Sequence, residues 1–390
     1  MDWKARVSAE IEDKRNILEE LALAIGEHPE MGFAEVKAAR LLTKVLEESG
    51  YHVTRGIAGL ETAFLGVCGH GQPNIALLCE YDALPELGHA CGHNLIAMAS
   101  VGAALGLSPF LSEIGGTISV FGTPAEETGS GKVILVEAGF FERVDAAMMF
   151  HPSNQNLLMA TGNALDAYEF RFKGKAAHAA DSPEEGINAL DGVLALFQGV
   201  NALREHVAEG VRIHGIITEG GTAANIVPER AVARFYIRAP ERELLNRITE
   251  KVLNVAKGAA LMTGTVVEWD EFELGTDDLR PSHPIALAFG ANLQRLGVTD
   301  IEEFAIGRGS SDMGNVSRVV PSIHPYLSIG DDLIAHTSEF AEASLGEKGL
   351  HVGIIAAQAL AFTAIDLLTN PGLLKAAKEE QIACKESERR

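Results

Sequence analysis

Cysteine is scarce in this chain of 390 residues, and its four copies form no pattern typical of disulfide-rich proteins. Cys68, Cys79, Cys91 and Cys384 are widely spaced, and no Cys-x-x-Cys pair occurs among them. Small disulfide-stabilised folds carry cysteine far more densely, so this class is excluded. We expect reduced thiols and a cytoplasmic protein. The charged, amphipathic segment that follows Met1 agrees with this, because a signal peptide would have an apolar core there.

Basic residues are also few. The chain has 32 Lys and Arg against 54 Asp and Glu, which gives a formal net charge of −22. Proteins that bind the phosphates of nucleic acids need clustered Lys and Arg, so we expect no nucleic-acid partner. The hydrophobic share of 47% and the charged share of 22% are typical of a globular protein. A chain of this length has room for two domains.

Long apolar runs free of interruption are missing too. The two most apolar stretches are 95–111, which contains a Pro and many small residues, and 352–368, which contains Gln358, Thr363 and Asp366. We interpret both as buried core helices and expect no membrane partner. The signature motifs of serine hydrolases, P-loop proteins, HExxH zinc peptidases and dinucleotide-binding enzymes are absent as well.

The sequence does contain an alternation of short β-rich runs with helical patterns. The predicted strands are 62–67, 75–79, 117–121 and 146–150, and the predicted helices are 8–28, 34–49, 95–107 and 132–138. This alternation predicts an α/β domain with a mixed or parallel sheet flanked by helices. In such sheets, functional residues gather at the carboxyl ends of the strands.

The pattern changes near residue 165. Between 166 and 275 the predicted order is strand, helix, strand, strand, helix, strand, which is that of a ferredoxin-like α+β domain. From 276 the first pattern returns and ends in an apolar helix over 346–368, after which we expect the tail beyond Lys375 to be loosely held. We therefore predict a larger α/β domain made of 1–165 and 276–390, interrupted by a smaller inserted domain at 166–275.

The densest group of candidate site residues follows the predicted strand 75–79. Cys91 and His93 lie two residues apart, and Gly92 between them permits a tight turn of the backbone. A thiolate and an imidazole at this spacing can bind one metal ion. A buried cysteine beside a histidine at a helix start is the structural alternative.

Three further candidates follow other strands. Glu126 and Glu127 follow 117–121 on a Gly-rich loop, where one carboxylate could bind a metal while the other stays free to carry a proton. An acidic helix N-terminus would explain the same pair. His151 ends the apolar run 146–150, and His336 follows a strand-like run at 326–329. The convergence of four such strand-end features on one domain favours a metal site.

The same motifs occur in a recognisable order along nearly the whole chain. They are EYDALPELGHACGHN, GTPAEETGSGK, FHPS, GKAAHAADSPEEGINAL, GTAANIVPERA and IAHTSEF. In this order they resemble the aminoacylase/carboxypeptidase-G family of dinuclear metallohydrolases. Within that family they are similar to the amidohydrolase branch, which includes indole-acetyl-amino-acid hydrolases and aminobenzoyl-glutamate hydrolases.

The resemblance implies two divalent metal ions per subunit, Zn²⁺ or Mn²⁺. The positions that match the ligands of the branch are Cys91, His93, Glu127, His151 and His336. Glu126 matches the general base, and Asp82 matches the acidic residue that orients a metal ligand.

For the inserted domain, the resemblance implies homodimerisation or a higher homo-oligomer. His178 matches a residue that reaches the active site of the other subunit, where we expect it to stabilise the oxyanion. Asn225 and Arg238 match positions that hold the substrate, the arginine often on a carboxylate. Without the family resemblance, we would interpret His178 as a solvated loop residue, Asn225 as a turn residue and Arg238 as a surface ion-pair residue.

The sequence departs from the family at two positions. Glu80 stands where the wider family has the His of an HxD motif, which fits the cysteine-containing branch. Asn94 stands where many members of the branch have Asp. The second departure favours aminobenzoyl-glutamate or dipeptide-like substrates over plant-hormone conjugates.

The expected function is metal-dependent hydrolysis of an amide bond in an N-acyl amino acid, a dipeptide or an aminobenzoyl-glutamate-like small molecule. Glu126 would take a proton from a metal-activated water and pass it to the departing amine. Three alternatives stay open: a thiol hydrolase with Cys91 as nucleophile, a non-catalytic binding protein, and a metal-assisted aryl-amine deaminase. The acyl group, the amino acid and the native metal are not specified by the sequence.

Overall fold

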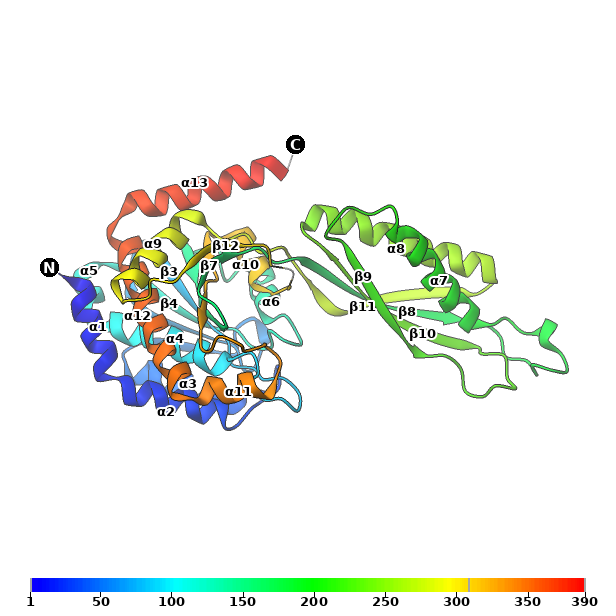
Figure 1. The fold of residues 1–390 in the computed structure, drawn as a ribbon, viewed down its shortest axis with the longest axis horizontal. Coiled ribbons are helices and arrows are strands. Elements are labelled where there is room, and N and C mark those ends of the chain that lie inside the picture. Colours follow the sequence, from blue (N-terminus) through cyan, green and yellow to red (C-terminus); the bar gives the residue numbers. More distant parts are fainter. Residues whose placement is uncertain (1, 308, 389–390) are drawn as a thin grey trace. The chain divides into compact units, whose positions relative to one another are not determined.

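The computed structural model describes residues 2–307 and 309–388, and its chain divides into two compact units (Figure 1). Met1–Gly162, Leu279–Gly307 and Ser311–Arg390 form the first, which we call the catalytic unit. Asn163–Asp278 with Arg308–Ser310 form the second, the inserted unit. The insertion expected at 166–275 lies within the second unit.

A six-stranded sheet with the strand order β1-β2-β4-β3-β5-β13 forms the centre of the catalytic unit. The strands are β1 (His52–Arg55), β2 (Phe64–His70), β3 (Asn74–Cys79), β4 (Gly116–Gly122), β5 (Ala146–Met148) and β13 (Ser322–Ile323). β3 is parallel to β4 and β5, and β13 is parallel to β5, whereas β1 and β2 pair antiparallel. The mixed α/β fold expected from the sequence is therefore confirmed.

Helices pack around this sheet. They are α1 (Trp3–Asp13), α2 (Arg15–Gly26), α3 (Val36–Glu48), α4 (His93–Leu107), α5 (Leu111–Ile114), α6 (Gly131–Glu137), α9 (His283–Arg295), α10 (Met313–Val319), α11 (Ser338–Leu345), α12 (Glu347–Thr369) and α13 (Pro371–Glu388). Two helical stretches, His93–Ile114 and Glu347–Thr369, are long and apolar enough to cross a membrane, but 78% of each apolar window is buried inside the protein. Because α4 and α12 pack against each other, we assign them to the core of the catalytic unit.

Two local expectations are wrong. The helix predicted over 8–28 is divided at Lys14 into α1 and α2. The tail beyond Lys375 is helical up to Glu388 and is anchored to the unit, because Ala377 is buried and Lys378 forms an ion pair with Asp145. These anchors connect residues far apart in the sequence, so the polar composition of the tail did not reveal them.

A second, four-stranded sheet in the catalytic unit was not predicted, although one of its strands lies in the strand-like run at 326–329. Its order is β12-β7-β14-β6, with β6 (His151–Ser153), β7 (Leu157–Ala160), β12 (Glu302–Ala305) and β14 (Tyr326–Ser328). Strands of three or four residues are too short to produce a period-2 pattern in a sequence. This sheet matters for the site because its strand β6 begins at His151.

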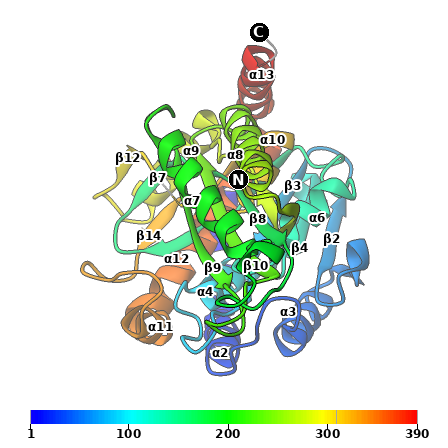
Figure 2. The same cartoon turned by 90° about the vertical axis from the view of Figure 1, so that its right-hand side faces the viewer.

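The inserted unit has a four-stranded antiparallel sheet with the order β11-β8-β10-β9. Its elements are β8 (Ala164–Lys173), α7 (Ala189–Arg204), β9 (Arg212–Glu219), β10 (Arg230–Ala239), α8 (Arg242–Thr263) and β11 (Val266–Thr276). The two helices cover one face of the sheet (Figures 1 and 2). Phe170, Phe172 and Phe235 are buried in the core between the sheet and the helices. The predicted ferredoxin-like topology is confirmed.

Candidate metal centre

The register of two parallel strands brings the acidic residues of the site to one sheet edge. Cys79, the last residue of β3, lies opposite Gly122, the last residue of β4. The segments that follow both strands therefore begin side by side. Glu80 and Asp82 follow β3, and the loop with Glu126 and Glu127 follows β4.

The turn before α4 places a thiol beside a histidine of the second sheet. Gly92 has a φ of +73°, and a Cβ added to it would lie 2.4 Å from Cγ of Pro152, so only glycine fits there. Cys91 precedes this turn, and its Sγ lies 3.4 Å from Nε2 of His151. The tight turn thus explains how Cys91 approaches a residue 60 positions away.

Asp82 orients ligands from both strand ends. Nδ1 of His93 lies 2.9 Å from Oδ1 of Asp82, so it carries the proton and donates it, which leaves Nε2 as the free ligand atom. Oδ2 of the same carboxylate accepts the backbone N–H of Glu127 at 3.0 Å. Burial raises the pKa of Asp82, but the charge and hydrogen bond of His93 outweigh it and hold this pKa below its ordinary value.

The donor atoms of the candidate ligands are close enough to share metal ions. Within each of three sets they lie no more than 4.8 Å apart, and the sets are Cys91 with His93 and His151, Cys91 with Glu127 and His336, and His93 with Glu126 and Glu127. His336 reaches the cluster from a backbone with a φ of +65°, held by a hydrogen bond from its N–H to the carbonyl of Ala90.

The donor set fits divalent metal ions. Among the described residues, Nε2 of His93 and Oε1 of Glu127 are buried without a hydrogen-bond partner, which is costly for polar atoms unless a cation or another partner is bound. A thiolate with imidazoles suits Zn²⁺, and the added carboxylate is compatible with Mn²⁺. All five expected ligands are therefore brought together, with Glu126 and Asp82 beside them.

Glu126, the neighbour of Glu127 in the sequence, lies among other acidic side chains. It is partly buried and lies close to Glu80 and Asp312, with carboxylate oxygens of the three residues within 4.8 Å of one another. Burial raises the pKa of Glu126 well above its ordinary value, and the negative charges of Glu80 and Glu127 raise it further. A carboxylate with raised proton affinity is suited to accept and return a proton near neutral pH.

The remaining expected site residues belong to the inserted unit. His178 is exposed, and its Nδ1 accepts the backbone N–H groups of Ala180 and Asp181 at 3.3 and 3.1 Å. The loop that carries His178 is hydrogen-bonded to the loop that carries Asn225, because the backbone carbonyl of Asn225 accepts the N–H of Ala179 at 3.0 Å. His178 and Asn225 are therefore neighbours within the inserted unit.

Arg238 lies on β10 of the inserted unit and is only partly exposed. One of its guanidinium nitrogens, Nη1, donates to Oγ of Ser310 at 2.9 Å, and the guanidinium lies 5.9 Å from the ring centre of Tyr236. Burial lowers its pKa below the ordinary value, but an arginine remains charged across the working range of proteins. The side chain is thus a partly shielded cation.

Sequence reasoning missed three buried polar residues of the centre: Lys132, Asp312 and His324. His324 directly follows β13, and its ring lies 5.4 Å from that of His151 and 5.0 Å from that of Tyr326. Burial, followed by the influence of His151, lowers the pKa of His324 to about 3. The strand-end rule that identified the candidate ligands would have found His324, but a two-residue strand has no pattern to recognise.

Comparisons with known proteins cover nearly the whole chain. Residues 164–261 match the family described as the peptidase dimerisation domain. The Xaa-Arg dipeptidase of Mus musculus is 38% identical, with 97% of this chain and 91% of that protein covered. A p-aminobenzoyl-glutamate hydrolase chain of Escherichia coli (strain K12) is 32% identical, with 95% and 93% covered.

Solved structures show the same fold. A putative aminohydrolase from methicillin-resistant Staphylococcus aureus has a TM-score of 0.76 at 17% identity, covering 94% of this chain and all of that one. A dinuclear metal-binding peptidase of the M20 family from Bacillus subtilis has a TM-score of 0.70 at 22% identity, covering 92% and 99%.

Proposed function

The chain belongs to the M20 family of peptidases and amide hydrolases, and we propose that its centre cleaves an amide bond next to a free carboxylate. This membership confirms the resemblance that the motifs indicated. The two relatives are named for an Xaa-Arg dipeptide and for p-aminobenzoyl-glutamate. Both compounds join an acyl or aminoacyl group to an amino acid, so we propose a substrate of this class.

We propose that two divalent ions, Zn²⁺ or Mn²⁺, are held at this centre. Their ligands would be Cys91, His93, Glu127, His151 and His336. The support is the set of donor atoms within 4.8 Å of one another, with Cys91 belonging to two of the sets. When bound, such ions lower the pKa of a water molecule and polarise the carbonyl of the scissile amide.

Glu126 carries the proton in this proposal. Its carboxylate accepts a proton from the attacking water as the water oxygen bonds to the carbonyl carbon. It then donates the proton to the amide nitrogen as the C–N bond breaks, which releases an amine and a carboxylic acid that then gives its own proton to water. The observation that supports this role best is the raised pKa of Glu126 beside ligands that Asp82 holds in place.

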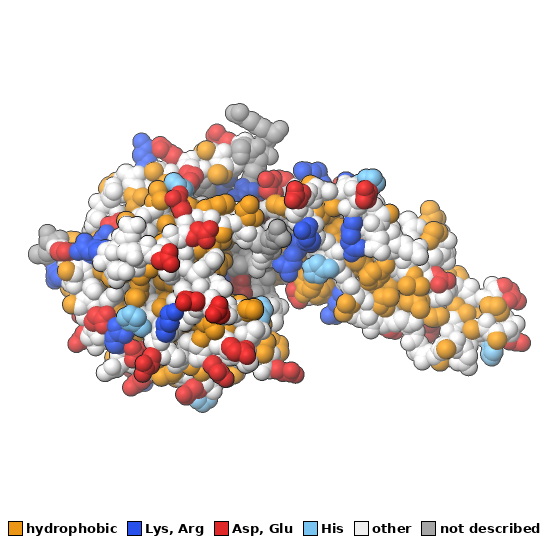
Figure 3. All heavy atoms as spheres, in the orientation of Figure 1, with side chains coloured by type: hydrophobic (Ala, Val, Ile, Leu, Met, Phe, Trp, Pro, Cys, Tyr) orange, Lys and Arg blue, Asp and Glu red, His pale blue; other side chains and the backbone are white. Residues whose placement is uncertain are grey.

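We propose that the inserted unit forms a homodimer and that His178 of one subunit acts in the site of the other. Because Nδ1 of His178 accepts two backbone N–H groups, its Nε2 carries the proton and is available to donate to an oxyanion. β9 is an edge strand with exposed Ile216 and Ile217, and hydrophobic side chains gather on this unit (Figure 3). Asn225 and Arg238 would hold the substrate, and Arg238 would do so by binding the carboxylate of the substrate.

The test is Glu126→Gln, compared with Glu142→Gln on the exposed surface as a control. Both variants are loaded with Mn²⁺ or Zn²⁺ under reducing conditions, and amine release is measured on dipeptides, N-acyl amino acids and aminobenzoyl-glutamate. We expect Glu126→Gln to keep its metal ions but to lose about 100-fold or more in kcat, because a general base is worth that much. Wild-type turnover of fully loaded Glu126→Gln would rule out this role.

The same assay separates the alternatives. Turnover by metal-stripped, reduced enzyme would favour Cys91 as a nucleophile, and ammonia released from an aryl amine would favour deamination. We also propose a reducing compartment, the cytoplasm, as the place of action, because oxidation of Cys91 would remove a metal ligand.

A further inference from the structure

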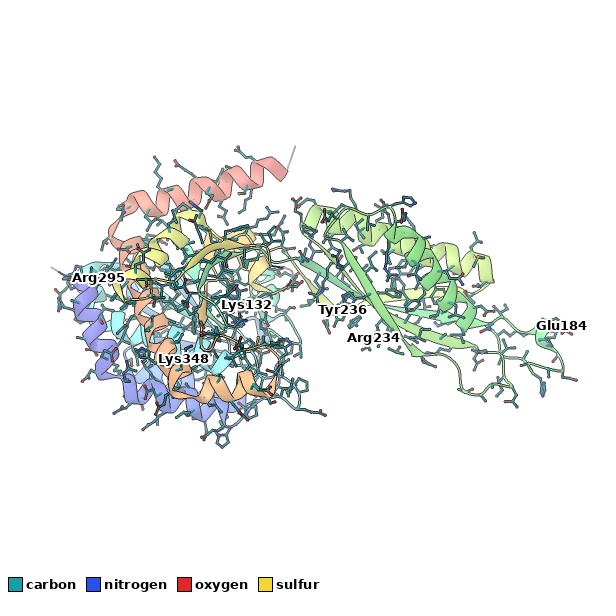
Figure 4. The ribbon with its side chains drawn as sticks, in the orientation of Figure 1. Lys132, Glu184, Arg234, Tyr236, Arg295 and Lys348 are labelled. Carbon is teal, nitrogen blue, oxygen red and sulfur yellow. The ribbon has the colours of Figure 1, made fainter. Side chains whose placement is uncertain are left out.

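Lys132 is a fully buried cation beside the candidate base. It lies in the first turn of α6, inside the catalytic unit (Figure 4), and its exposed fraction is 0%. Its Nζ lies 2.6 Å from Oε1 of Glu80 and 2.7 Å from Oδ1 of Asp312. Its backbone N–H also donates to the other oxygen of Asp312 at 2.9 Å. Lys132 thus connects the end of β3 with the start of α10.

The partners of Lys132 form an acidic cluster with the geometry of a cation site. Glu80, Glu126 and Asp312 each offer an oxygen within 4.8 Å of the others, and we call these three residues the carboxylate cage. Glu80 and Asp312 are buried and Glu126 is partly buried, so without a cation their three carboxylates would repel one another and would be strongly destabilising. The ammonium of Lys132 supplies the compensating positive charge, and its side chain keeps that charge in place.

The loop that carries Glu126 also delivers Lys132. A Cβ added to Gly131 would lie 2.0 Å from the carbonyl oxygen of Pro124, so the start of α6 packs directly on the backbone before Glu126. This contact fixes the lysine relative to the base. Burial lowers the pKa of Lys132, but the charges of Asp312 and Glu80 outweigh it and raise this pKa above the ordinary value, so the side chain stays protonated.

The cage adjoins the candidate metal centre. Oε2 of Glu80, the oxygen that does not contact Lys132, lies 3.4 Å from Nε2 of His93. A divalent ion held by His93 therefore has an acidic cluster as its neighbour, and carboxylates attract Mn²⁺ strongly. Something must keep such an ion out of the cage if Glu126 is to remain available for proton transfer.

We propose that Lys132 is a positioning residue whose tethered ammonium occupies the carboxylate cage, excludes a further divalent ion from it, and so keeps Glu126 free to act as the base. The proposal rests on the function proposed above. Lys132 does not touch the reacting atoms. It acts by filling, with a charge that cannot dissociate, the place that an additional metal ion would take.

The test is the number of Mn²⁺ ions bound per subunit, measured by elemental analysis and equilibrium titration. Lys132→Gln keeps the approximate length of the side chain but removes its charge, and Lys132→Arg is the matched control that retains a tethered cation. We expect Lys132→Gln to bind one Mn²⁺ ion more than the wild type, and Lys132→Arg to bind the same number. As this additional ion binds, kcat of Lys132→Gln should fall by about 100-fold, because Glu126 becomes a ligand.

The folding of each variant is checked by circular dichroism, and a second variant is available if Lys132→Gln does not fold. If Lys132→Gln does not fold, the double variant Lys132→Gln with Asp312→Asn removes one charge of each sign and is titrated instead. We expect it to bind the additional ion through Glu80 and Glu126. An unchanged ion number in whichever of these two variants folds, with Lys132→Arg as reference, would overturn the proposal. This readout counts ions, so it is independent of whether Glu126→Gln is active.

Discussion

Glu35 is a buried carboxylate that supports the loop carrying Glu126, and it offers a sharp test of the electrostatics of the site. Its Oε1 accepts the backbone N–H of Ala125 at 2.8 Å, and its Oε2 accepts the hydroxyl of Thr62 at 2.8 Å. Ala125 has a φ of +58°, a conformation that is strained for a residue with a Cβ. The hydrogen bond that Glu35 accepts from Ala125 therefore stabilises the turn immediately before the base.

The pH dependence of this support follows from the pKa of Glu35. Burial raises it from 4.5 to about 7 in the folded protein, despite the hydrogen bonds that favour the charged form. Between these two values the folded state holds a proton that the unfolded state has released. The free energy of unfolding is therefore highest below 4.5 and falls as the pH rises towards 7. A difference of roughly 2.5 pKa units corresponds to about 3 kcal/mol.

Glu35→Gln removes this titration while keeping an acceptor for Ala125. We expect the variant to gain stability relative to the wild type as the pH rises from 5 to 8, by up to about 3 kcal/mol. The assay is thermal or urea unfolding of both proteins in chelator at several pH values, so that the pH dependence of metal binding is excluded. Glu48→Gln, on the exposed surface of α3, is the control. A difference between variant and wild type that does not change with pH would refute this reasoning.

Three further predictions concern the ligands and the substrate. Asp82→Asn should weaken metal binding by about 10- to 100-fold in a chelator competition. The asparagine has one acceptor oxygen where the carboxylate has two, so it cannot hold both His93 and Glu127. Unchanged affinity would contradict this. Cys91→Ser should lower the ratio of Zn²⁺ to Mn²⁺ bound from an equimolar mixture, because the soft ligand is gone. Arg238→Met should raise KM by about 10- to 100-fold at nearly constant kcat, the cost of one charge-assisted hydrogen bond. The same increase on a substrate whose carboxylate is amidated would argue against that contact.

The sequence was most informative where a strand is long enough to show its pattern. β3 and β4 are continuous apolar runs, so their ends could be located, and the acidic residues after each end could be expected to meet. The turn at Gly92 was readable for a similar reason, since glycine between two candidate ligands indicates a tight backbone. These local signals, together with the family motifs, were enough to name the seven candidate residues that the catalytic unit brings together.

Short strands and distant pairs could not be predicted in the same way. β13 has two residues, so His324 after it carried no recognisable signal. Lys132 and Asp312 are 180 positions apart, and nothing in the sequence near either of them indicates that they form a buried ion pair. Such pairs exist only because the fold brings the starts of two helices together, and they are found from the structure.

The division of roles among the carboxylates follows from what each one touches. Asp82 is saturated by N–H donors from His93 and Glu127, so it can orient ligands but cannot readily leave them. Glu80 is neutralised by Lys132, so its negative charge is already compensated. Of these three residues, Glu126 is the one whose pKa is raised, by burial and by the negative charges of its neighbours. Residues of one chemical type thus become an orienting group, a charge partner and a base because the two parallel strand ends place them against different donors.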